Sequence, residues 1–447
     1  MAIFINTFVL LFLTVVIGYK LASIRIRGSS LGAAMVLFTG ILISFLVGTY
    51  INSLPDESTL KATGQALMDN SIVPSSVLSV FLVFFISGVG LVASKELLPV
   101  LKKYGLKFLA MAIIITTLGM AGTFAIGKIS GNYDTFEMSG VFSGALSSTP
   151  GMTAGLLAST DKAKDNLENY DTLDKDTQEK MVEIIGEPGA EGFSEEQKKE
   201  YVDYASTATG IGYTITFPFG NLLVLVAINL IPLMFRINIR KEREEYELEM
   251  ASSHKQEKSG DSTGDEKEDA TKTFSVTAYF LVLAAGYMLG LIKIGSFSLS
   301  ATGGVLIASL VLGSLKKTKF FDFDFDPTVL KSIREIGMVG TLGATGLRLG
   351  YPVIKALTGT QAMLAVYSLI IGLSAIFIGF LIGRYIFKMN WMMLSGALCG
   401  GMTNTSGLGI AVDAAGCEYP SIGYAASYPF AVVMMVIYTV MIQGFSF

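Results

Sequence analysis

Two stretches of fourteen residues determine how this chain folds. They read SGVFSGALSSTPGM at residues 139–152 and SGALCGGMTNTSGL at residues 395–408. Both combine glycine and small hydroxyl residues with few bulky aliphatic side chains, and both lie between long apolar runs. Irregular backbone is tolerated at membrane depth only where it lines a cavity or is buried in protein. We therefore predict that each stretch forms a re-entrant hairpin rather than a complete membrane span.

The composition of the whole chain is that of a polytopic membrane protein. Of its 447 residues, 51% are hydrophobic and 16% are charged, and the mean hydropathy is +0.56. Soluble domains carry about 25% charged residues on average. More than half of the charged residues lie in two windows, 161–203 and 236–272. This pattern excludes a soluble enzyme and a disulfide-stapled secreted domain. The net charge of −4, with no basic patch, excludes nucleic-acid binding.

Ten apolar runs have about the length that a helix needs to cross a bilayer. Clusters of Lys and Arg follow the first, third, fifth, seventh and ninth runs and place these connections inside, whereas the acidic connections near 56–69 and 134–137 are outside. With two hairpins that return to the side they entered from, both termini are predicted to be extracellular. The ten runs are Phe4–Tyr19, Leu31–Tyr50, Val77–Val92, Leu106–Ile126, Ile211–Phe235, Thr273–Ile292, Ala301–Leu315, Ile336–Leu349, Gln361–Ile382 and Ser421–Ile442.

The membrane part is a duplication. The two hairpin stretches match at an offset of 256, and IGYTITFPF at 211–219 matches IGYAASYPF at 422–430 at an offset of 211. The difference of 45 is the size of an acidic segment that the second half lacks. Each copy holds five spans, and an odd number forces the copies into opposite orientations. Inverted repeats with interrupted helices are typical of secondary transporters that bind substrate near the bilayer midplane.

The duplication divides the chain into four parts. Residues 1–160 and 205–236 are predicted to form the first membrane repeat, and residues 273–447 the second. Residues 161–204 form an acidic extracellular insert, expected to be partly helical. Residues 237–272 form a charged cytoplasmic linker, expected to begin as an extension of the preceding helix and to continue as disorder rich in Ser, Gly, Asp and Lys.

The hairpin tips are the predicted substrate site. The N-termini of half-helices carry free N–H groups and partial positive charge, which suit a carboxylate. The alternative that these residues only pack helices explains the glycines but not the matching polar tips. The residues expected to bind substrate are Ser147, Ser148, Thr149, Gly151, Thr153, Thr403, Asn404, Thr405, Ser406 and Gly407.

Five further polar residues near apolar spans are candidates. Tyr213 and Tyr424 begin the spans after the hairpins, where a tyrosine is either an interfacial anchor or part of the site. Asn221 is costly inside an apolar helix without a partner, which favours a place along the substrate path. Arg348 suits a substrate carboxylate, but its position near the outer end of a span favours snorkelling to the interface. Asp413 suits either a cation or proton site or an exposed hairpin end.

No cofactor or metal site is expected. Cys399 and Cys417 are the two cysteines, and the one histidine, His254, lies in the charged linker, so a metal-ligand cluster has too few residues. No nucleophile–base pair is visible, and we therefore expect the chain not to be an enzyme.

The hairpin tips carry a family resemblance. GALSSTPGM at 144–152 and GMTNTSGL at 401–408, each followed by a Gly-Tyr and a Pro-Phe motif, resemble the duplicated permease domain of the aspartate:alanine exchanger family. The resemblance implies a homodimeric antiporter of the bacterial inner membrane for amino acids or small carboxylates. It also implies an elevator-type architecture, in which a core carrying the hairpins moves against a scaffold. The short linker, the acidic insert and Ser406 in place of the proline of the first copy depart from the family pattern.

We therefore expect a secondary active transporter that exchanges amino acids or small carboxylates, such as aspartate and alanine, by alternating access. Its expected partners are this small-molecule substrate, the lipid bilayer and a second copy of the chain. Two other functions stay open at this point. One is a cation-coupled symporter or cation/proton antiporter on the same scaffold, and the other is a passive channel.

Overall fold

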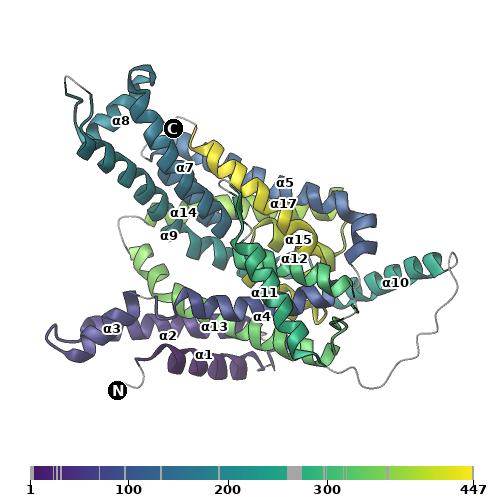
Figure 1. Ribbon diagram of the computed structural model, residues 1–447. Coiled ribbons are helices and arrows are strands. Elements are labelled where there is room, and N and C mark those ends of the chain that lie inside the picture. The colour runs from purple at the N-terminus through teal and green to yellow at the C-terminus, as the bar shows by residue number, and fades with distance from the viewer. Residues whose placement is uncertain are drawn as a thin grey trace.

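The computed structural model consists of helices joined by turns and by two small β-hairpins (Figure 1). It describes residues 5–444 apart from 24, 27–28, 31–32, 70, 95–96, 131–132, 190–191, 259–273, 295–296, 299, 316, 319 and 359–361. Within these residues the β-structure consists of two antiparallel pairs of two-residue strands and two isolated bridges, Gly189–Gly192 and Lys317–Asp322. The predicted all-α fold class is confirmed.

The first half of the chain ends with a 40-residue helix, α9. Its elements are, in order, α1 (Thr7–Ala22), β1 (Arg25–Ile26), β2 (Ser29–Ser30), α2 (Ala34–Ser53), α3 (Thr59–Asp69), α4 (Ser75–Ala93), α5 (Leu97–Ser130), α6 (Thr135–Ala145), α7 (Thr149–Glu168), the 3₁₀ turn η2 (Tyr170–Thr172), α8 (Lys175–Ile185) and α9 (Glu195–Met234).

The second half follows a charged helix, α10 (Ile239–Lys258). Its elements are α11 (Val276–Leu291), β3 (Lys293–Ile294), β4 (Phe297–Ser298), α12 (Ser300–Ser314), α13 (Pro327–Thr358), α14 (Ala362–Leu381) with the π-helical turn η3 (Ile382–Ile386), α15 (Trp391–Gly401), α16 (Thr405–Ala415) and α17 (Tyr419–Ile442).

Six helices in the described part of the chain are long and apolar enough to cross a membrane: α2, α4, α5, α9, α14 and α17. Three shorter apolar helices are α1 with 16 residues, α11 with 16 and α12 with 15. Each of the ten predicted spans overlaps one of these helices or α13. The chain is therefore a multi-pass membrane protein.

The order of elements in the first half recurs in the second. A helix, a β-hairpin and a helix are followed by two long helices, a pair of half-helices and a final long helix, while α3 and α8 occur only in the first half. Close contacts recur as well. A Cβ on Gly18 would lie 2.5 Å from the Cα of Val36, and a Cβ on Gly286 would lie 2.5 Å from the Cα of Val305. Glycine thus lets α1 approach α2, and α11 approach α12, in the same way.

The helices form two groups that pack densely within themselves and touch each other at few places. One, here called the core group, consists of α5, α6, α7, α9 and α14 to α17. The other, here called the frame group, consists of α1, α2, α4, α11, α12 and α13. In Figure 1, α1, α2, α4 and α13 run together along the lower part, whereas α5, α7, α14 and α17 lie above them.

Backbone contacts hold the two half-helix pairs in the core group. We call α6 with α7 hairpin 1, and α15 with α16 hairpin 2. A Cβ on Gly140 of α6 would lie 2.1 Å from the carbonyl oxygen of Thr209, and a Cβ on Gly396 of α15 would lie 1.8 Å from that of Pro420. Glycine at these positions is therefore required for α6 to pack on α9 and for α15 to pack on α17.

The two hairpins enter the core group from opposite ends of the molecule. The open end of hairpin 1 packs with α8 and α9 around Phe136, Ala163, Met181 and Tyr201. The open end of hairpin 2 packs against α10. Figure 1 shows α3 and α8 at one end of the molecule and α10 at the other.

The two charged segments differ in detail from the sequence-based expectation. Helix α7 runs on to Glu168, so the acidic insert begins as a continuation of hairpin 1, and α9 begins at a Ser194–Gln197 capping box inside it. Helix α10 is not an extension of α9, because a turn at Phe235 and Arg236, with Arg236 in the left-handed region at φ 52°, separates the two helices. The predicted disorder in the linker falls largely on residues 259–272, which lie outside the described residues.

The glycine contacts of the hairpins give a first prediction. Gly140→Ala and Gly396→Ala each force a Cβ against a backbone carbonyl and should lower the free energy of unfolding by about 1–3 kcal/mol, the usual cost of overpacking. Gly122→Ala on α5 is the matched control, because its Cβ would meet ordinary neighbours no closer than 3.6 Å. Thermal unfolding of the detergent-solubilised variants measures the difference, and equal midpoints for all three variants would contradict this packing.

Candidate substrate site

Each hairpin tip is a tight turn with the same backbone geometry. The half-helices α6 and α15 end in Schellman motifs: Ser148 N–H donates to the Ser143 carbonyl at 2.7 Å, and Asn404 N–H donates to the Cys399 carbonyl at 2.8 Å. Such a turn needs one residue in the left-handed region, which is usually glycine. Here it is Ser147 at φ 51° and Thr403 at φ 48°.

The next residue of each tip caps the half-helix that follows. Ser148 Oγ accepts a hydrogen bond from Gly151 N–H at 3.1 Å, and Asn404 Oδ1 accepts one from Gly407 N–H at 2.6 Å. Both caps are buried. They orient the first turns of α7 and α16.

The two tips bind each other through a crossed pair of hydrogen bonds. Ser147 Oγ donates to the Met402 carbonyl at 3.1 Å, and Thr403 Oγ1 donates to the Leu146 carbonyl at 3.0 Å. Asn404 Nδ2 also donates to Ser147 Oγ at 3.0 Å. Each tip thus satisfies a terminal carbonyl of the other, and the two half-helix N-termini are held close together.

Asn221 of α9 joins this network from the side. Asn404 Nδ2 donates to Asn221 Oδ1 at 2.7 Å, while no described residue accepts from Asn221 Nδ2. The residue before it is glycine, where a Cβ would lie 2.4 Å from the Ala145 carbonyl, so α9 is able to approach hairpin 1 closely. Asn221 is 4% exposed and lines the cavity described below.

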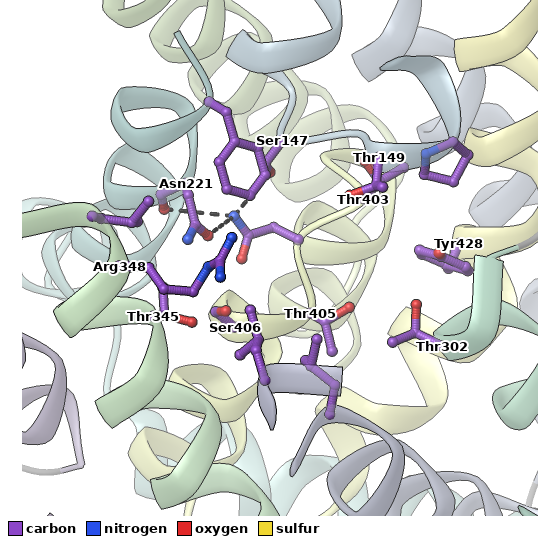
Figure 2. Close-up of a pocket in the computed structure, with 16 residues that line it drawn as sticks. Ser147, Thr149, Asn221, Thr302, Thr345, Arg348, Thr403, Thr405, Ser406 and Tyr428 are labelled. Atoms are coloured by element: carbon purple, nitrogen blue, oxygen red, sulfur yellow. Dashed lines mark hydrogen bonds between the residues drawn. The ribbon is translucent and has the colours of Figure 1, made fainter. Parts of the chain in front are cut away.

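The core group and the frame group enclose a cavity of about 130 Å³ at the tips (Figure 2). The core group contributes ten lining residues: Ser147, Thr149, Pro150, Phe217, Asn221, Thr403, Asn404, Thr405, Ser406 and Tyr428. The frame group contributes six: Leu78, Leu82, Thr302, Thr345, Arg348 and Leu349.

Among the described residues that line the cavity, Arg348 is the only one that carries a charge. Its guanidinium donates to the Val73 carbonyl, and no carboxylate of a described residue lies within ion-pair distance. Figure 2 shows the side chain of Arg348 reaching from α13 toward the hairpin tips. A half-buried guanidinium without a counter-ion, next to two helix N-termini, makes this cavity suited to an anion.

Two segments of the chain match one family model. The model, described as a predicted permease membrane region, is that of the aspartate:alanine exchangers, and it covers residues 10–233 and 278–444. The first segment contains hairpin 1 and the second contains hairpin 2.

The chain belongs to this family.

Relatives similar to this chain are uncharacterized transporters from three bacteria. One from Rhodopirellula baltica is 32% identical over 165 residues, which are 35% of this chain and 31% of the relative. One from Desulfotalea psychrophila is 29% identical over 171 residues, 37% and 32% of the two chains, and one from Bacteroides thetaiotaomicron is 28% identical over 181 residues, 39% and 34%. The chain spans about a third of the length of the curated relatives it matches. Membership in this family points to a transporter and not to an enzyme.

The residues predicted from the exchanger resemblance and from the tip pattern fall into two sets. The first set lines the cavity and consists of Ser147, Thr149, Thr403, Asn404, Thr405, Ser406 and Arg348. The second set lies behind the cavity wall and consists of Ser148, Gly151, Thr153, Gly407, Tyr213 and Tyr424.

Two tyrosines of the second set form hydrogen bonds with hydroxyl groups of the first set. Tyr424 OH lies 2.9 Å from Thr405 Oγ1, and Tyr213 OH lies 3.4 Å from Thr149 Oγ1. Both tyrosines thus hold the first hydroxyl of a half-helix in place. Asp413 lies away from the cavity, where its carboxylate accepts a hydrogen bond from Ala33 N–H at the start of α2 at 2.8 Å.

Several lining residues were not predicted from the sequence. Phe217 and Tyr428 occupy equivalent positions of the two copies, at the same offset of 211 as the tyrosine pair, so the duplication contained a signal for them. Thr302 and Thr345 are hydroxyl residues inside frame helices. Their place in the wall depends on how the two groups pack, which no local pattern records.

The base of hairpin 2 is held by α10. Glu242 accepts hydrogen bonds from Arg384 Nη2 at 2.6 Å, from Arg384 Nη1 at 3.0 Å and from Trp391 N–H at 2.8 Å. Asn390 Nδ2 donates to the Glu242 carbonyl at 2.7 Å, and the ring centroids of Tyr246 and Tyr419 lie 4.7 Å apart. The Glu-rich segment is therefore docked on the core group and is not merely a solvated linker.

Glu242→Gln should lower the free energy of unfolding by about 1.5–3 kcal/mol, because it removes the charge that pairs with Arg384 and caps α15. Glu245→Gln on the same helix is the control, since the Lys241–Glu245 pair is exposed and 3.5 Å long, a kind that contributes about 0–1 kcal/mol. Trp391 is the single tryptophan of the chain, so its fluorescence reports unfolding at this base. Equal midpoints for the two variants would contradict a structural role of Glu242.

Proposed function

We propose that the chain is a secondary transporter that exchanges small solutes bearing a carboxylate, either amino acids or other small carboxylates, by alternating access. The observation that carries the proposal is the cavity between the two groups of helices. Both hairpin tips and Arg348 face it, so one small site combines two half-helix N-termini with a guanidinium that has no counter-ion. A carboxylate is able to accept hydrogen bonds from both half-helix N-termini and from the guanidinium.

The division into two groups supports an elevator-type movement of the core group against the frame group. Among the described residues, the polar contacts between the groups include the Arg334–Glu418 ion pair and the hydrogen bond from Ala33 N–H to the Asp413 carboxylate. Both contacts involve the end of the core group that carries hairpin 2. A few polar contacts of this kind are able to break and reform, whereas the dense packing within each group favours rigid-body motion.

The uncompensated charge of Arg348 gives a reason for exchange. When the site is empty, sliding the core group past the frame group exposes a guanidinium and free N–H groups to an apolar surface without counter-charge, which is costly. A bound carboxylate neutralises them and lowers this cost. The loaded core group then moves more readily than the empty one, which is the condition for antiport.

We further propose the arrangement in the membrane that the charge distribution favours. The recurring order of elements corresponds to two inverted repeats, with α10 in the cytoplasm and the acidic insert and both termini outside a bacterial cytoplasmic membrane. The exchanger resemblance adds a homodimer to this arrangement.

Counterflow in proteoliposomes tests the proposed function. Vesicles loaded with aspartate, alanine, lactate or malate should accumulate the labelled form of a transported solute without an ion gradient, because an antiporter needs only a second solute. Uptake that requires a sodium or proton gradient would favour a coupled symporter, and currents far above carrier turnover would favour a channel. No uptake of any carboxylate would overturn the proposal.

Arg348→Ala should lower the apparent affinity for the transported carboxylate by about 10- to 150-fold, the equivalent of the 1.5–3 kcal/mol of a charge-assisted hydrogen bond. Arg348→Lys retains the charge but not the planar fork of donors. Its apparent affinity should therefore fall between those of the wild type and of Arg348→Ala. Lys128→Ala, which removes a cation remote from the cavity on α5, is the control. Unchanged affinity in Arg348→Ala would exclude the guanidinium from the site.

A crosslink between the groups tests the movement. In a background without Cys399 and Cys417, the pair Ala33→Cys and Asp413→Cys should form a disulfide on oxidation. The disulfide should stop transport, and reduction should restore it. The control pair Ser143→Cys and Thr439→Cys lies within the core group, where the two hydroxyl oxygens are 3.2 Å apart, and its crosslink should leave transport intact. Full transport by the first pair after complete crosslinking would contradict a moving core group.

A further inference from the structure

Helices α9 and α14 pack against each other and end at the same level of the core group. The sequence has no Asp, Glu, Lys or Arg between Asp203 and Arg236, which follows α9, and none between Lys355 and Arg384, which follows α14. Each arginine is therefore the first charge after a stretch long enough to cross a bilayer. The two arginines mark the level at which this face of the protein passes from the hydrocarbon to the lipid headgroups.

An apolar groove lies between α9 and α14 on the hydrocarbon side of this level. Its walls include the exposed side chains of Val226 and Leu230 from α9 and of Leu373 from α14. Ser374 is the only polar residue among the described residues that line the groove, and its hydroxyl donates to the Ile371 carbonyl of its own helix at 2.8 Å. The groove therefore suits a hydrocarbon chain and offers no free polar side chain.

A polar pocket adjoins this groove at the level of the two arginines. The ring centroid of Phe235, which lines the pocket, lies 6.0 Å from that of Phe377, which lines the groove. Met234 of the groove also precedes Phe235 directly in the chain. An apolar groove and a polar pocket that meet at headgroup level match the two parts of a phospholipid, its acyl chain and its headgroup.

The charges of the pocket favour an anionic headgroup. Among the described residues that line it, three are cations (Arg236, Lys241 and Arg384) and two are carboxylates (Glu242 and Glu245). Glu242 accepts two hydrogen bonds from Arg384, and Lys241 lies 3.5 Å from Glu245. Arg236 has no carboxylate of a described residue within ion-pair distance. The pocket thus has an excess of one positive charge, which a single phosphodiester balances.

Arg236 occupies a position where glycine is the usual residue. Helix α9 ends in a Schellman motif, in which Ile237 N–H donates to the Pro232 carbonyl at 2.9 Å and Arg236 has a φ of 52°. A side chain is strained in this left-handed conformation, so the backbone alone favours glycine. The exposed guanidinium forms no ion pair with a described residue that would offset this strain. A ligand outside the protein chain gives the side chain a reason to be there.

We propose that the groove and the pocket together form a binding site for one anionic phospholipid. Its phosphodiester binds Arg236 and Lys241, and an acyl chain lies between α9 and α14. With α10 in the cytoplasm, as proposed above, this lipid belongs to the cytoplasmic leaflet. Glu242 and Arg384, which hold the base of hairpin 2, line the same pocket, so the bound lipid should also stabilise the docking of α10. The inference does not depend on which solute is transported.

Lipid binding to the wild-type protein is the first test. The delipidated full-length chain in detergent is titrated with phosphatidylglycerol and with phosphatidylcholine of the same acyl chains, and binding is measured by native mass spectrometry and thermal shift. Phosphatidylglycerol should bind about tenfold more tightly, the effect of about one charge-assisted hydrogen bond. Equal binding of the two lipids would overturn the inference. Glycerol 3-phosphate that competes as well as the intact lipid would also overturn it, because the site would then bind a free phosphate.

A matched pair of variants locates the headgroup. Arg236→Gln should remove the preference for phosphatidylglycerol. Arg240→Gln is the control and should retain it, because Arg240 lies outside the pocket and pairs with Glu244 at 3.2 Å. Loss of the preference in neither variant, or in both equally, would contradict the proposed contact.

Two further variants keep the test independent of folding. Arg236→Gly removes the charge and relieves the left-handed backbone, so without lipid it should unfold no earlier than the wild type and should still lose the preference. Val226→Trp fills the groove and should weaken the binding of both lipids by a similar factor. Unchanged lipid binding in a folded Val226→Trp variant would exclude the groove from the site. All of these results leave the proposed exchange of carboxylates unaffected, because counterflow measures that function separately.

Discussion

The hairpin tips depend on one constraint: backbone groups exposed where a helix breaks inside the membrane have no water to bind. In this chain the two breaks satisfy each other. Ser147 and Thr403 each donate a hydroxyl to a terminal carbonyl of the opposite tip. This explains why neither position is glycine, although both residues are left-handed, a conformation that costs a non-glycine residue about 1–3 kcal/mol. Glycine would relieve the backbone but would have no side chain to donate.

The duplication produces two nearly equivalent sets of helices. A few positions at which the two copies carry different residues add polar groups to the cavity. Ser406 occupies the position that Pro150 has in the first copy, and Arg348 the position that Val92 has. Equivalent glycines, tyrosines and caps occur in both halves, so the framework is repeated. In the proposed site, the positions where the copies differ would orient the solute, because a strictly symmetric site would bind a polar solute equally well in two orientations.

Much of this arrangement could be predicted from the sequence, because the determinants are local. Glycine and hydroxyl residues between apolar runs predicted both hairpins, and the repeated Ser/Thr/Asn pattern predicted which residues form the tips. The orientation of single side chains could not be predicted in the same way. The sequence favoured a snorkelling Arg348, whereas α13 turns this residue inward next to Val73, and the Glu-rich start of the linker gave no sign that Glu242 caps α15. Both depend on packing between segments more than a hundred residues apart.

The crossed bonds between the tips also restrict how the two sides of the membrane are sealed. If one hairpin swung away alone, Ser147, Thr403 and the Leu146 and Met402 carbonyls would all lose their partners in an apolar medium. Hairpin 1 and hairpin 2 are therefore not able to open independently of each other. In the proposed mechanism the two hairpins would move together as one unit, with the solute bound between them and the frame group.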